Sequence, residues 1–484
     1  MANQYLALDL GASGGRAILG AVEHGRLRTA EVHRFSNTPV EMGGHFYWDV
    51  LRLLHGIHTG LQNAAETGFV SAAVDTWGVD YGLLDASGVL LQNPMHYRDA
   101  RTKGMKKTLE PVVSSQEFYS INGLQQMEIN TVYQLYADFQ SRPWLKQSAS
   151  AMLLMPDLFH WMLTGKQVTE RSIASTTQLL DAATGDWSRS LIDKLELPAH
   201  IFTDIIPSGT VIGSIDDRVC KQLGIPSAHI TAVCGHDTQC AMAAIPTKDD
   251  DFIFLSCGTW ALFGTETEKP ILTEKSAHYA VTNEIGYQNR VSFLQNISGL
   301  WLIQETKRIL AQQGEHYSYA QLEQLAENAD SFVSLINVDD PRFGTAGDMP
   351  AHIRAYCTES NQPVPRSVGA VMRCIYESLA LRFAKALRQI SECTGKQYRS
   401  IHMVGGGVKD KLLCQMTANA CGIPVMAGPV EATVCGNLMI QMLADGSVNS
   451  LEEARAIIGN SVTVTQYIPQ EDYSGVWERY LTLP

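Results

Sequence analysis

Asp237 is the residue whose neighbours best suit it to act as a general base. It lies in Gly235-His-Asp-Thr238, after the apolar stretch Ile230–Cys234 and before alanine-rich residues that predict a helix. A carboxylate at the C-terminal end of a strand can face a cleft between domains and accept a proton from a hydroxyl that attacks phosphorus. The same position suits a helix N-cap, which stabilises a helix by about 1 kcal/mol. Both interpretations are open from this segment alone.

Three glycine-rich turns could bind phosphate, because backbone N–H groups approach an anion closely where no Cβ intervenes. They are Asp9-Leu-Gly-Ala-Ser-Gly-Gly-Arg16, Cys257-Gly-Thr259 and Gly405-Gly-Gly407. The first is neither a Walker A loop nor a dinucleotide-binding fingerprint, since no G-x-x-x-x-G-K-[ST] pattern occurs and a strand pattern follows the turn. Asp9 is a candidate ligand of Mg²⁺ through water, because Mg²⁺ keeps most of its hydration shell. The alternatives are tight structural turns and an aspartate that accepts bonds from local N–H groups.

Two further segments have the composition of a sugar-binding site. Asp75-Thr-Trp-Gly-Val-Asp80 combines two carboxylates, a hydroxyl and an indole, which suits the hydroxyl groups and C–H faces of a sugar. Tyr97-Arg-Asp-Ala-Arg-Thr102 adds hydrogen-bonding groups. A buried Trp77 and a solvated charged turn are the structural alternatives.

The apolar patterns predict the elements that must position these groups. Strands are expected at Tyr5–Leu10, Ala17–Val22 and Arg28–Phe35, forming a meander, followed by a helix from Asp49 to about Glu66. Further along we expect strands at Val70–Asp75, Ile230–Cys234, Phe252–Ser256, Trp260–Gly264 and Ile401–Val404, a hairpin over Tyr81–Leu91, and helices over Leu153–Leu163 and Lys411–Cys421.

An internal similarity predicts a duplicated architecture. Leu6–Gly20 and Phe252–Gly264 share the order strand, polar residue, glycine turn with a hydroxyl, strand, glycine. Each could open one half of the molecule. We place the boundary near Pro246–Asp251 and expect two domains, residues 1–246 and 247–484.

Composition excludes several classes of protein. The 484 residues are 45% hydrophobic and 18% charged, as in ordinary globular proteins, and the net charge of -13 disfavours binding to nucleic acid or an anionic membrane. No apolar run approaches the roughly 18 residues of a membrane span, so we expect a cytoplasmic protein. All ten cysteines lie at or beyond Cys220 without a C-x-x-C pair, which favours buried, reduced thiols over a zinc site.

The segments together resemble the FGGY family of carbohydrate kinases, within the superfamily of actin, hexokinase and Hsp70-like ATPases. The resemblance covers nearly the whole chain and also includes Leu154-Met-Pro-Asp157, Asn296-Ile-Ser-Gly-Leu-Trp-Leu-Ile-Gln304, Asp339-Asp-Pro-Arg-Phe343 and Gly428-Pro-Val-Glu-Ala432. It implies an α/β fold of two ribonuclease-H-like domains with an interdomain cleft. The N-terminal domain would carry the sugar site and the first phosphate turn, and the C-terminal domain the nucleotide site.

Carried over by position, the resemblance assigns roles to individual residues. It implies ATP contacts from Ala12, Ser13, Gly14, Gly15, Arg16, Thr259, Gln304 and Gly406, and sugar contacts from Gly78, His236, Asp237, Thr238 and Asn296, with Asp237 as the proton acceptor. Family members often have Ser-Ser within the Ser13-Gly14-Gly15 segment, and Ser-Ser-Gly-Thr in place of Ser256-Cys257-Gly258-Thr259. The first departure removes a hydroxyl but keeps the backbone donors.

The reaction that the resemblance implies is transfer of the γ-phosphoryl group of MgATP to the 1-hydroxyl of L-rhamnulose, a step of L-rhamnose catabolism. Another ketose or polyol of the family, such as L-fuculose, xylulose or glycerol, is the alternative acceptor, because one side chain can change which hydroxyl stereochemistry is accepted. A non-catalytic sugar sensor or an actin-like module is a further alternative. No obligate protein partner is expected.

Overall fold

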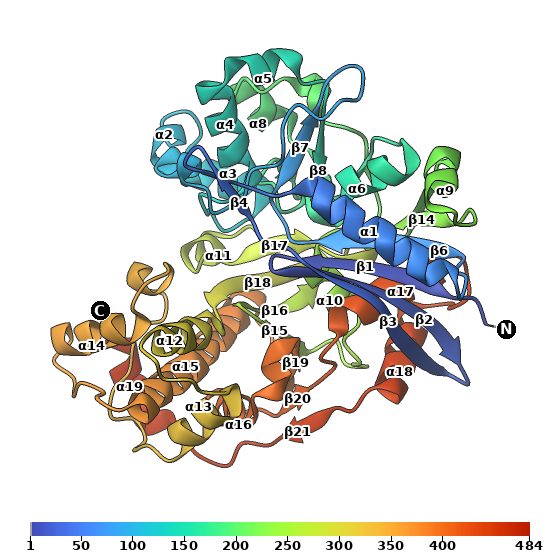
Figure 1. Cartoon of the computed structure of the whole chain (residues 1–484). Helices are drawn as coiled ribbons and strands as arrows, with labels where there is room; N and C mark the ends of the chain where they lie inside the picture. The colour runs from blue at the N-terminus through green and yellow to red at the C-terminus, as the bar shows by residue number, and fades with distance from the viewer. Residues whose placement is uncertain (1) are drawn as a thin grey trace. The chain divides into compact units, whose positions relative to one another are not determined.

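Backbone contacts divide the chain into two units, each built from more than one stretch of sequence. The structure is a computed structural model that describes residues 2–484 (Figure 1). The first unit comprises residues up to Lys248, Thr267–Phe293 and Ala432–Ser461, and the second comprises Asp249–Glu266, Leu294–Glu431 and Val462–Pro484. The first therefore includes two segments that the expected division counted with residues 247–484. The expected division itself stays a prediction.

A six-stranded sheet forms the centre of the first unit. Its order is β13 (Thr210–Ser214), β14 (His229–Ala232), β6 (Ser71–Thr76), β1 (Tyr5–Gly11), β2 (Gly14–Glu23) and β3 (Arg26–Ser36). β1 pairs antiparallel with β2 and parallel with β6. The predicted meander is confirmed, although the first turn is tighter than expected, because Gly14, Gly15 and Arg16 already belong to β2.

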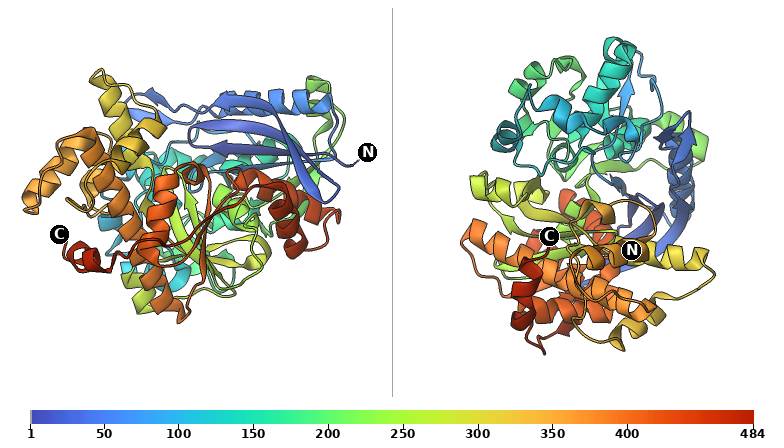
Figure 2. Two further views of the ribbon diagram at one scale, coloured as in Figure 1. Left: turned by 90° about the horizontal axis from the view of Figure 1, so that it is seen from below. Right: turned by 90° about the vertical axis from the view of Figure 1, so that its left-hand side faces the viewer.

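Alternation along β1 directs its side chains to two differently covered faces of the sheet. Leu8 and its partner Ala17 lie beside Gly60 of α1 (Val50–Ala65), which Asp49 caps as predicted. On the other face, Gly20 lies against Leu438 of α17 (Ala432–Ala444). α1 and the N-terminal strands, drawn in blue, lie side by side in the different views (Figures 1 and 2). Asp9, one residue from Leu8, therefore belongs to the face that α17 covers.

The rest of the first unit is mostly helical. Its helices are α2 (Met105–Leu109), α3 (Ser115–Asn122), α4 (Thr131–Ser141), α5 (Pro143–Ser148), α6 (Met155–Thr164), α7 (Arg171–Ala174), α8 (Arg189–Lys194), α9 (Asp217–Leu223), α10 (Asp237–Ala243), α11 (Glu274–His278) and α18 (Leu451–Ser461). Short strands are β4 (Val40–Met42), β5 (His45–Tyr47), β9 (Thr169–Glu170), β10 (Leu180–Asp181), β11 (Asp186–Trp187), β12 (Ile205–Ile206) and β17 (Thr282–Ile285).

The hairpin expected over Tyr81–Leu91 is confirmed, since the Leu91 N–H donates to the Leu83 carbonyl and Leu84 bridges antiparallel to Leu90. β7 (Tyr81–Leu84) also pairs antiparallel with β8 (Ala151–Leu154), about 70 residues away, which was not predicted. β8 also takes the first two residues of the helix predicted at Leu153–Leu163, because both strands bury their apolar side chains completely. The predicted cap at Gly165 is confirmed, since this glycine is left-handed.

The second unit repeats the strand arrangement of the first. Its strands lie in the order β18 (Val291–Ser298), β16 (Trp260–Thr267), β15 (Phe252–Cys257), β19 (Ser400–Val404), β20 (Val425–Ala427) and β21 (Thr465–Tyr467). β15 pairs antiparallel with β16 and parallel with β19, as β1 does with β2 and β6. Its helices are α12 (Trp301–Gln312), α13 (Tyr319–Glu327), α14 (Met349–Glu359), α15 (Val368–Thr394), α16 (Lys411–Cys421) and α19 (Ser474–Leu481). The shared topology agrees with the predicted duplication.

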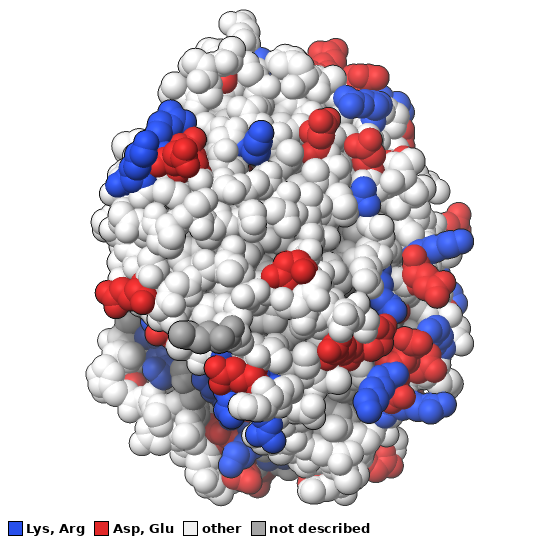
Figure 3. Space-filling view, turned by 90° about the vertical axis from the view of Figure 1, so that its right-hand side faces the viewer, with Lys and Arg blue, Asp and Glu red and all other residues white. Residues whose placement is uncertain are grey.

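The distribution of surface charge, the state of the cysteines and the polarity of the helices agree with what the composition predicts. On the face drawn in Figure 3, lysine and arginine side chains lie among aspartate and glutamate, without an extended basic patch. None of the ten cysteines, all of which lie within the described residues, is in a disulfide, and seven of them are buried. Within residues 2–484, no helix is both long and apolar enough to cross a membrane.

The contact between α10 and α17 gives a first prediction. A Cβ added at Gly436 would lie 1.8 Å from the carbonyl oxygen of Cys240, so Gly436→Ala must push the two helices apart. We expect a loss of about 1–3 kcal/mol in stability, seen as a lower melting temperature. Gly475→Ala in α19 is the matched control, because open space surrounds that helical glycine. Equal melting temperatures for the two variants would contradict this account of the packing.

Candidate active site

Three aspartates of the first unit lie near one another at the covered face of its sheet. Asp9 and Asp75 are register partners on β1 and β6, and Asp237 is the first residue of α10. Asp75 is wholly buried, while 31% of the Asp237 side chain is exposed. Asp9 forms an ion pair with Arg16. The predicted base and the predicted Mg²⁺ ligand are thus close enough to influence each other electrostatically.

Burial and mutual repulsion raise the pKa of two of these carboxyls. For Asp75, burial is the largest cause of a pKa far above the ordinary value, and Asp9 and Asp237 raise it further. Asn437 of α17 opposes this shift by donating to Asp75 Oδ2 at 2.6 Å. Burial also raises the pKa of Asp237, against the opposing effects of His236 and Thr238. A raised pKa makes Asp237 a stronger base than an ordinary aspartate.

The cluster fits Mg²⁺ chemically. Asp9 and Asp75 offer carboxylate oxygens, which Mg²⁺ prefers, and Asp75 Oδ1 is buried without a hydrogen-bond partner. Residues 2–484 contain no group of three or more His, Cys, Asp or Glu placed to hold a metal ion directly. A Mg²⁺ ion at Asp9 would therefore depend on water for most of its ligands.

His236 lies between two carboxylates. Its Nδ1 is 2.9 Å from Glu284 Oε2, and its Nε2 is 3.5 Å from Asp237 Oδ1. Asp237 Oδ1 also accepts hydrogen bonds from the N–H and hydroxyl of Thr238, at 2.6 and 3.2 Å. His236, not Asp237, is the N-cap residue of α10, and its side chain makes no capping bond. Sequence reasoning missed Glu284, because it lies on the buried strand Thr282–Ile285, three of whose four residues are polar, and no apolar pattern marks this strand in the sequence.

Gly78 lies in a strained turn close to this histidine in the fold. Thr76, two residues earlier, bridges to His236, and its N–H donates to the Gly235 carbonyl. Val79 has a φ of 69°, which is rare for a β-branched residue and costs conformational energy. Its N–H donates to Thr176 Oγ1 and its carbonyl accepts from Thr131. Such strain is common at functional sites.

Trp77 is buried, as its structural alternative predicts, and Asp80 is buried beside it. Asp80 Oδ2 accepts from the indoles of Trp48 and Trp77, at 2.6 and 2.9 Å, and from the N–H of Tyr97. Burial raises the pKa of Asp80 to about 6, although the bonds from Trp48, Trp77 and Gln134 oppose the shift. The Gln134 amide donates to Asp80 Oδ1 at 2.9 Å, so the carboxylate joins four chain segments and does not present itself to a ligand.

The glycines of the first turn are required by packing as well as by the turn. A Cβ on Gly15 would overlap the ring of Phe35, and one on Gly14 would lie 3.1 Å from the Phe35 carbonyl oxygen. The exposed turn consists of Ala12 and Ser13. Their backbone is held by Asn37, whose N–H donates to the Ser13 carbonyl.

The second unit brings three predicted ATP contacts together. Thr259 Oγ1 donates to Gln304 Oε1 at 3.2 Å, and the Gly405–Gly407 turn packs directly on Cys257. The third predicted contact, Gly406, lies in this glycine turn, where a Cβ on Gly407 would lie 2.5 Å from Cys257 Sγ. Asn296 is on β18 in this unit, whereas the other predicted sugar contacts belong to the first unit.

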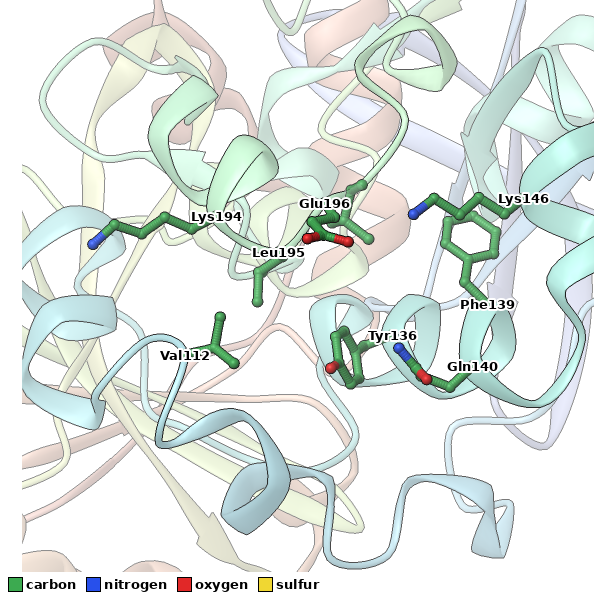
Figure 4. A pocket seen from close by; sticks show the side chains of 9 residues that line it. Val112, Tyr136, Phe139, Gln140, Lys146, Lys194, Leu195 and Glu196 are labelled. Carbon is green, nitrogen blue, oxygen red and sulfur yellow. The ribbon is translucent and has the colours of Figure 1, made fainter.

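The first unit also has a solvent-open cavity (Figure 4). Its volume is about 190 Å³, and its lining includes Tyr136, Phe139, Lys146 and Glu196. None of the residues predicted for the site lines it.

Both halves of the chain match models of one protein family. Residues 4–244 match the N-terminal domain of the FGGY family of carbohydrate kinases, and residues 253–444 match the C-terminal domain of that family. The chain therefore belongs to the FGGY family of carbohydrate kinases and has its two-domain α/β fold.

Several curated relatives of the chain are rhamnulokinases. The chain is 40% identical to the rhamnulokinase of Bacteroides thetaiotaomicron, with 97% of each sequence covered. It is 38% identical to that of Enterococcus faecalis (98% of this chain, 96% of the relative) and 36% identical to that of Bacillus subtilis (96% of each).

Solved structures share the fold at low identity. A gluconate kinase from Lactobacillus acidophilus superposes with a TM-score of 0.83 at 18% identity, covering 100% of this chain and 97% of the other. A Plasmodium falciparum glycerol kinase with ADP superposes with a TM-score of 0.80 at 13% identity, covering 99% and 96%.

Removing the Asp80 carboxylate tests its structural role. Asp80→Ala leaves two buried indole N–H groups without their acceptor, at a cost of about 1–3 kcal/mol for each. We expect a lower melting temperature and an unchanged affinity for ATP, measured by calorimetry. Asp217→Ala, which removes an exposed aspartate of α9, should change neither quantity. An Asp80→Ala variant as stable as the wild type would contradict this role.

Proposed function

We propose that the protein transfers the γ-phosphoryl group of MgATP to the 1-hydroxyl of L-rhamnulose. The observation that supports L-rhamnulose as the substrate is the identity of 36–40% with rhamnulokinases over nearly the full length of both sequences. The relation extends through the segments that contain the candidate base and its neighbours. The expected site of action is the cytoplasm.

Asp237 is the proposed proton acceptor. Thr238 and His236 hold its Oδ1 from one side, and the side chain is partly exposed, so it can reach a hydroxyl group. Phosphoryl transfer passes through a loose transition state, in which the nucleophile needs orientation more than strong basicity. The carboxylate orients the attacking hydroxyl and receives its proton as the bond to phosphorus forms.

ATP is proposed to contact the Ala12–Arg16 segment, Thr259, Gln304 and Gly406. The exposed N–H groups of the first turn suit phosphate oxygens, and the hydroxyl of Thr259 and the bare backbone of Gly406 suit further nucleotide contacts. Asp9 is the proposed Mg²⁺ residue, through water. When bound, Mg²⁺ offsets negative charge on the phosphates. Arg16, which pairs with Asp9, supplies a permanent positive charge beside the same turn.

The variant Asp237→Asn tests whether Asp237 is the proton acceptor. The amide keeps the size of the side chain but cannot accept the proton, so kcat should fall by about two orders of magnitude or more. Affinity for ATP, measured by calorimetry, should stay near that of the wild type. Asp217→Asn supplies the control for the same chemical change at an exposed position. Full activity of Asp237→Asn would remove this residue from the role.

A panel of acceptors tests the substrate. ADP release with MgATP is measured for L-rhamnulose, L-fuculose, L-xylulose, D-xylulose and glycerol. We expect L-rhamnulose to have the highest kcat/KM, because a site built for one set of hydroxyls leaves polar groups unpaired with another. A higher kcat/KM for another acceptor would overturn L-rhamnulose as the substrate, but the proposed kinase activity would stand. Turnover of none would favour a sugar sensor.

A further inference from the structure

Glu284 is a buried carboxylate with no role in the reaction described so far. It lies on β17 within the first unit, with 6% of its surface exposed. Its Oε2 accepts a hydrogen bond from Gln239 Nε2 at 3.0 Å and lies 2.9 Å from Nδ1 of His236. A carboxylate this close to an imidazole determines which ring nitrogen carries a proton.

A second layer of hydrogen bonds holds Glu284 in place. Gln239 Oε1 accepts from the hydroxyl of Ser292 at 2.7 Å, and both residues are buried. Because one oxygen of Gln239 is engaged by Ser292, its amide must present the N–H₂ group to Glu284. The Glu284 side chain therefore has a defined orientation before any ligand binds.

The other ring nitrogen of His236 points toward the reacting group. Nε2 is 3.5 Å from Asp237 Oδ1, so Glu284, His236 and Asp237 form a line of carboxylate, imidazole and carboxylate. The backbone N–H of His236 also donates to Ser172 Oγ at 3.4 Å. His236 is thus held by its backbone N–H and by Nδ1 of its ring, while Nε2 faces Asp237.

We propose that Glu284 is a positioning residue of the acceptor site and that it acts through His236. Glu284 accepts a hydrogen bond from Nδ1–H and so fixes the imidazole ring with Nε2 directed at Asp237 and the acceptor hydroxyl. The proposal rests on the proposed function, since it describes how the same site holds the hydroxyl that is phosphorylated. Glu284 itself does not touch the acceptor. Its effect on catalysis passes entirely through the imidazole.

The charges around His236 favour the doubly protonated ring. Burial lowers the pKa of His236, but three carboxylates, Glu284, Asp237 and Glu170, raise it, and the net shift is upward from the ordinary value. An imidazolium donates hydrogen bonds from both nitrogens. With Nδ1–H bound to Glu284, Nε2–H remains available to orient Asp237 or an acceptor oxygen.

A double-mutant cycle separates this role from a structural one. Glu284→Gln should raise KM for the acceptor by about tenfold or more, the cost of weakening a hydrogen bond to a charged group, and leave KM for ATP unchanged. In a His236→Gln background the same change should alter kcat/KM by less than about twofold, because the residue it acts through is gone. If His236→Gln turns over too slowly, acceptor binding by calorimetry replaces kcat/KM. Additive effects would overturn the proposal.

The pH profile supplies a readout that loss of packing would not move. His236 keeps its proton up to its raised pKa, so activity toward the acceptor should fall as pH rises through that value. Removing the Glu284 charge lowers the pKa, and the alkaline limb of kcat/KM should move to lower pH by about one unit or more. A limb that stays in place in Glu284→Gln would overturn the proposal.

Controls cover misfolding and the wrong substrate. Glu66→Gln makes the same chemical change at an exposed position after α1. If Glu284→Gln does not fold, Glu284→Asp keeps the charge and shortens the side chain; a raised KM with the alkaline limb retained supports the proposal, and an unchanged KM overturns it.

If the wild type prefers another acceptor, the proposed substrate fails and the cycle is run with that acceptor. If it phosphorylates none, the proposed function fails, and nitrogen-15 NMR of labelled histidine decides the positioning role separately. A His236 signal, assigned with His236→Gln, that is the same in wild type and Glu284→Gln would overturn it.

Discussion

Electrostatic repulsion among neighbouring carboxylates is the constraint on which the first unit depends. Asp9 and Asp237 both raise the pKa of the buried Asp75, and Asp9 also raises the pKa of the partly exposed Asp237. Each is offset by a different kind of partner: a guanidinium for Asp9, the amide of Asn437 for Asp75, and the Thr238 donors for Asp237. The helices α10 and α17 supply two of these partners, so their approach to the sheet is part of the electrostatic balance.

The close approach of these helices has a specific origin in the sequence. Gly436 lets α17 lie against the backbone of Cys240, and the next residue, Asn437, then reaches Asp75. Gln441, one turn later, donates to Asn437 Oδ1 and to the Leu6 carbonyl. Gly436 and the amides of Asn437 and Gln441 therefore connect the packing of α17 to the protonation of Asp75 on the sheet.

Local patterns predicted the fold where short-range geometry decides it. The N-terminal meander, the capped helix α1 and helix α16 follow from alternation, helical spacing and an aspartate cap, all readable within about 20 residues. The pairing of β7 with β8 could not be read in this way, because the partner strand lies far along the chain, beyond the reach of any local pattern.

The candidate site also divides into residues that local motifs predict and residues that only the fold brings together. Thr259 and Gln304 lie in contact, and Asp9 and Asp237 lie in one charged cluster, as expected for residues chosen by motif. Glu284 was missed because its importance comes from the fold: a residue without a motif becomes the neighbour of His236 only when β17 packs near α10. The motif glycines Gly14 and Gly15 had a second reason that only packing shows, namely Phe35.

The packing of Cys257 on the glycine turn has a chemical consequence. The thiol is 1% exposed, and burial raises its pKa to about 12. Oxidants and alkylating agents react with the thiolate, which is nearly absent at neutral pH for such a group. Cys257 thus adds no redox sensitivity to this turn of the second unit. Its sulfur serves as an apolar surface for Gly407.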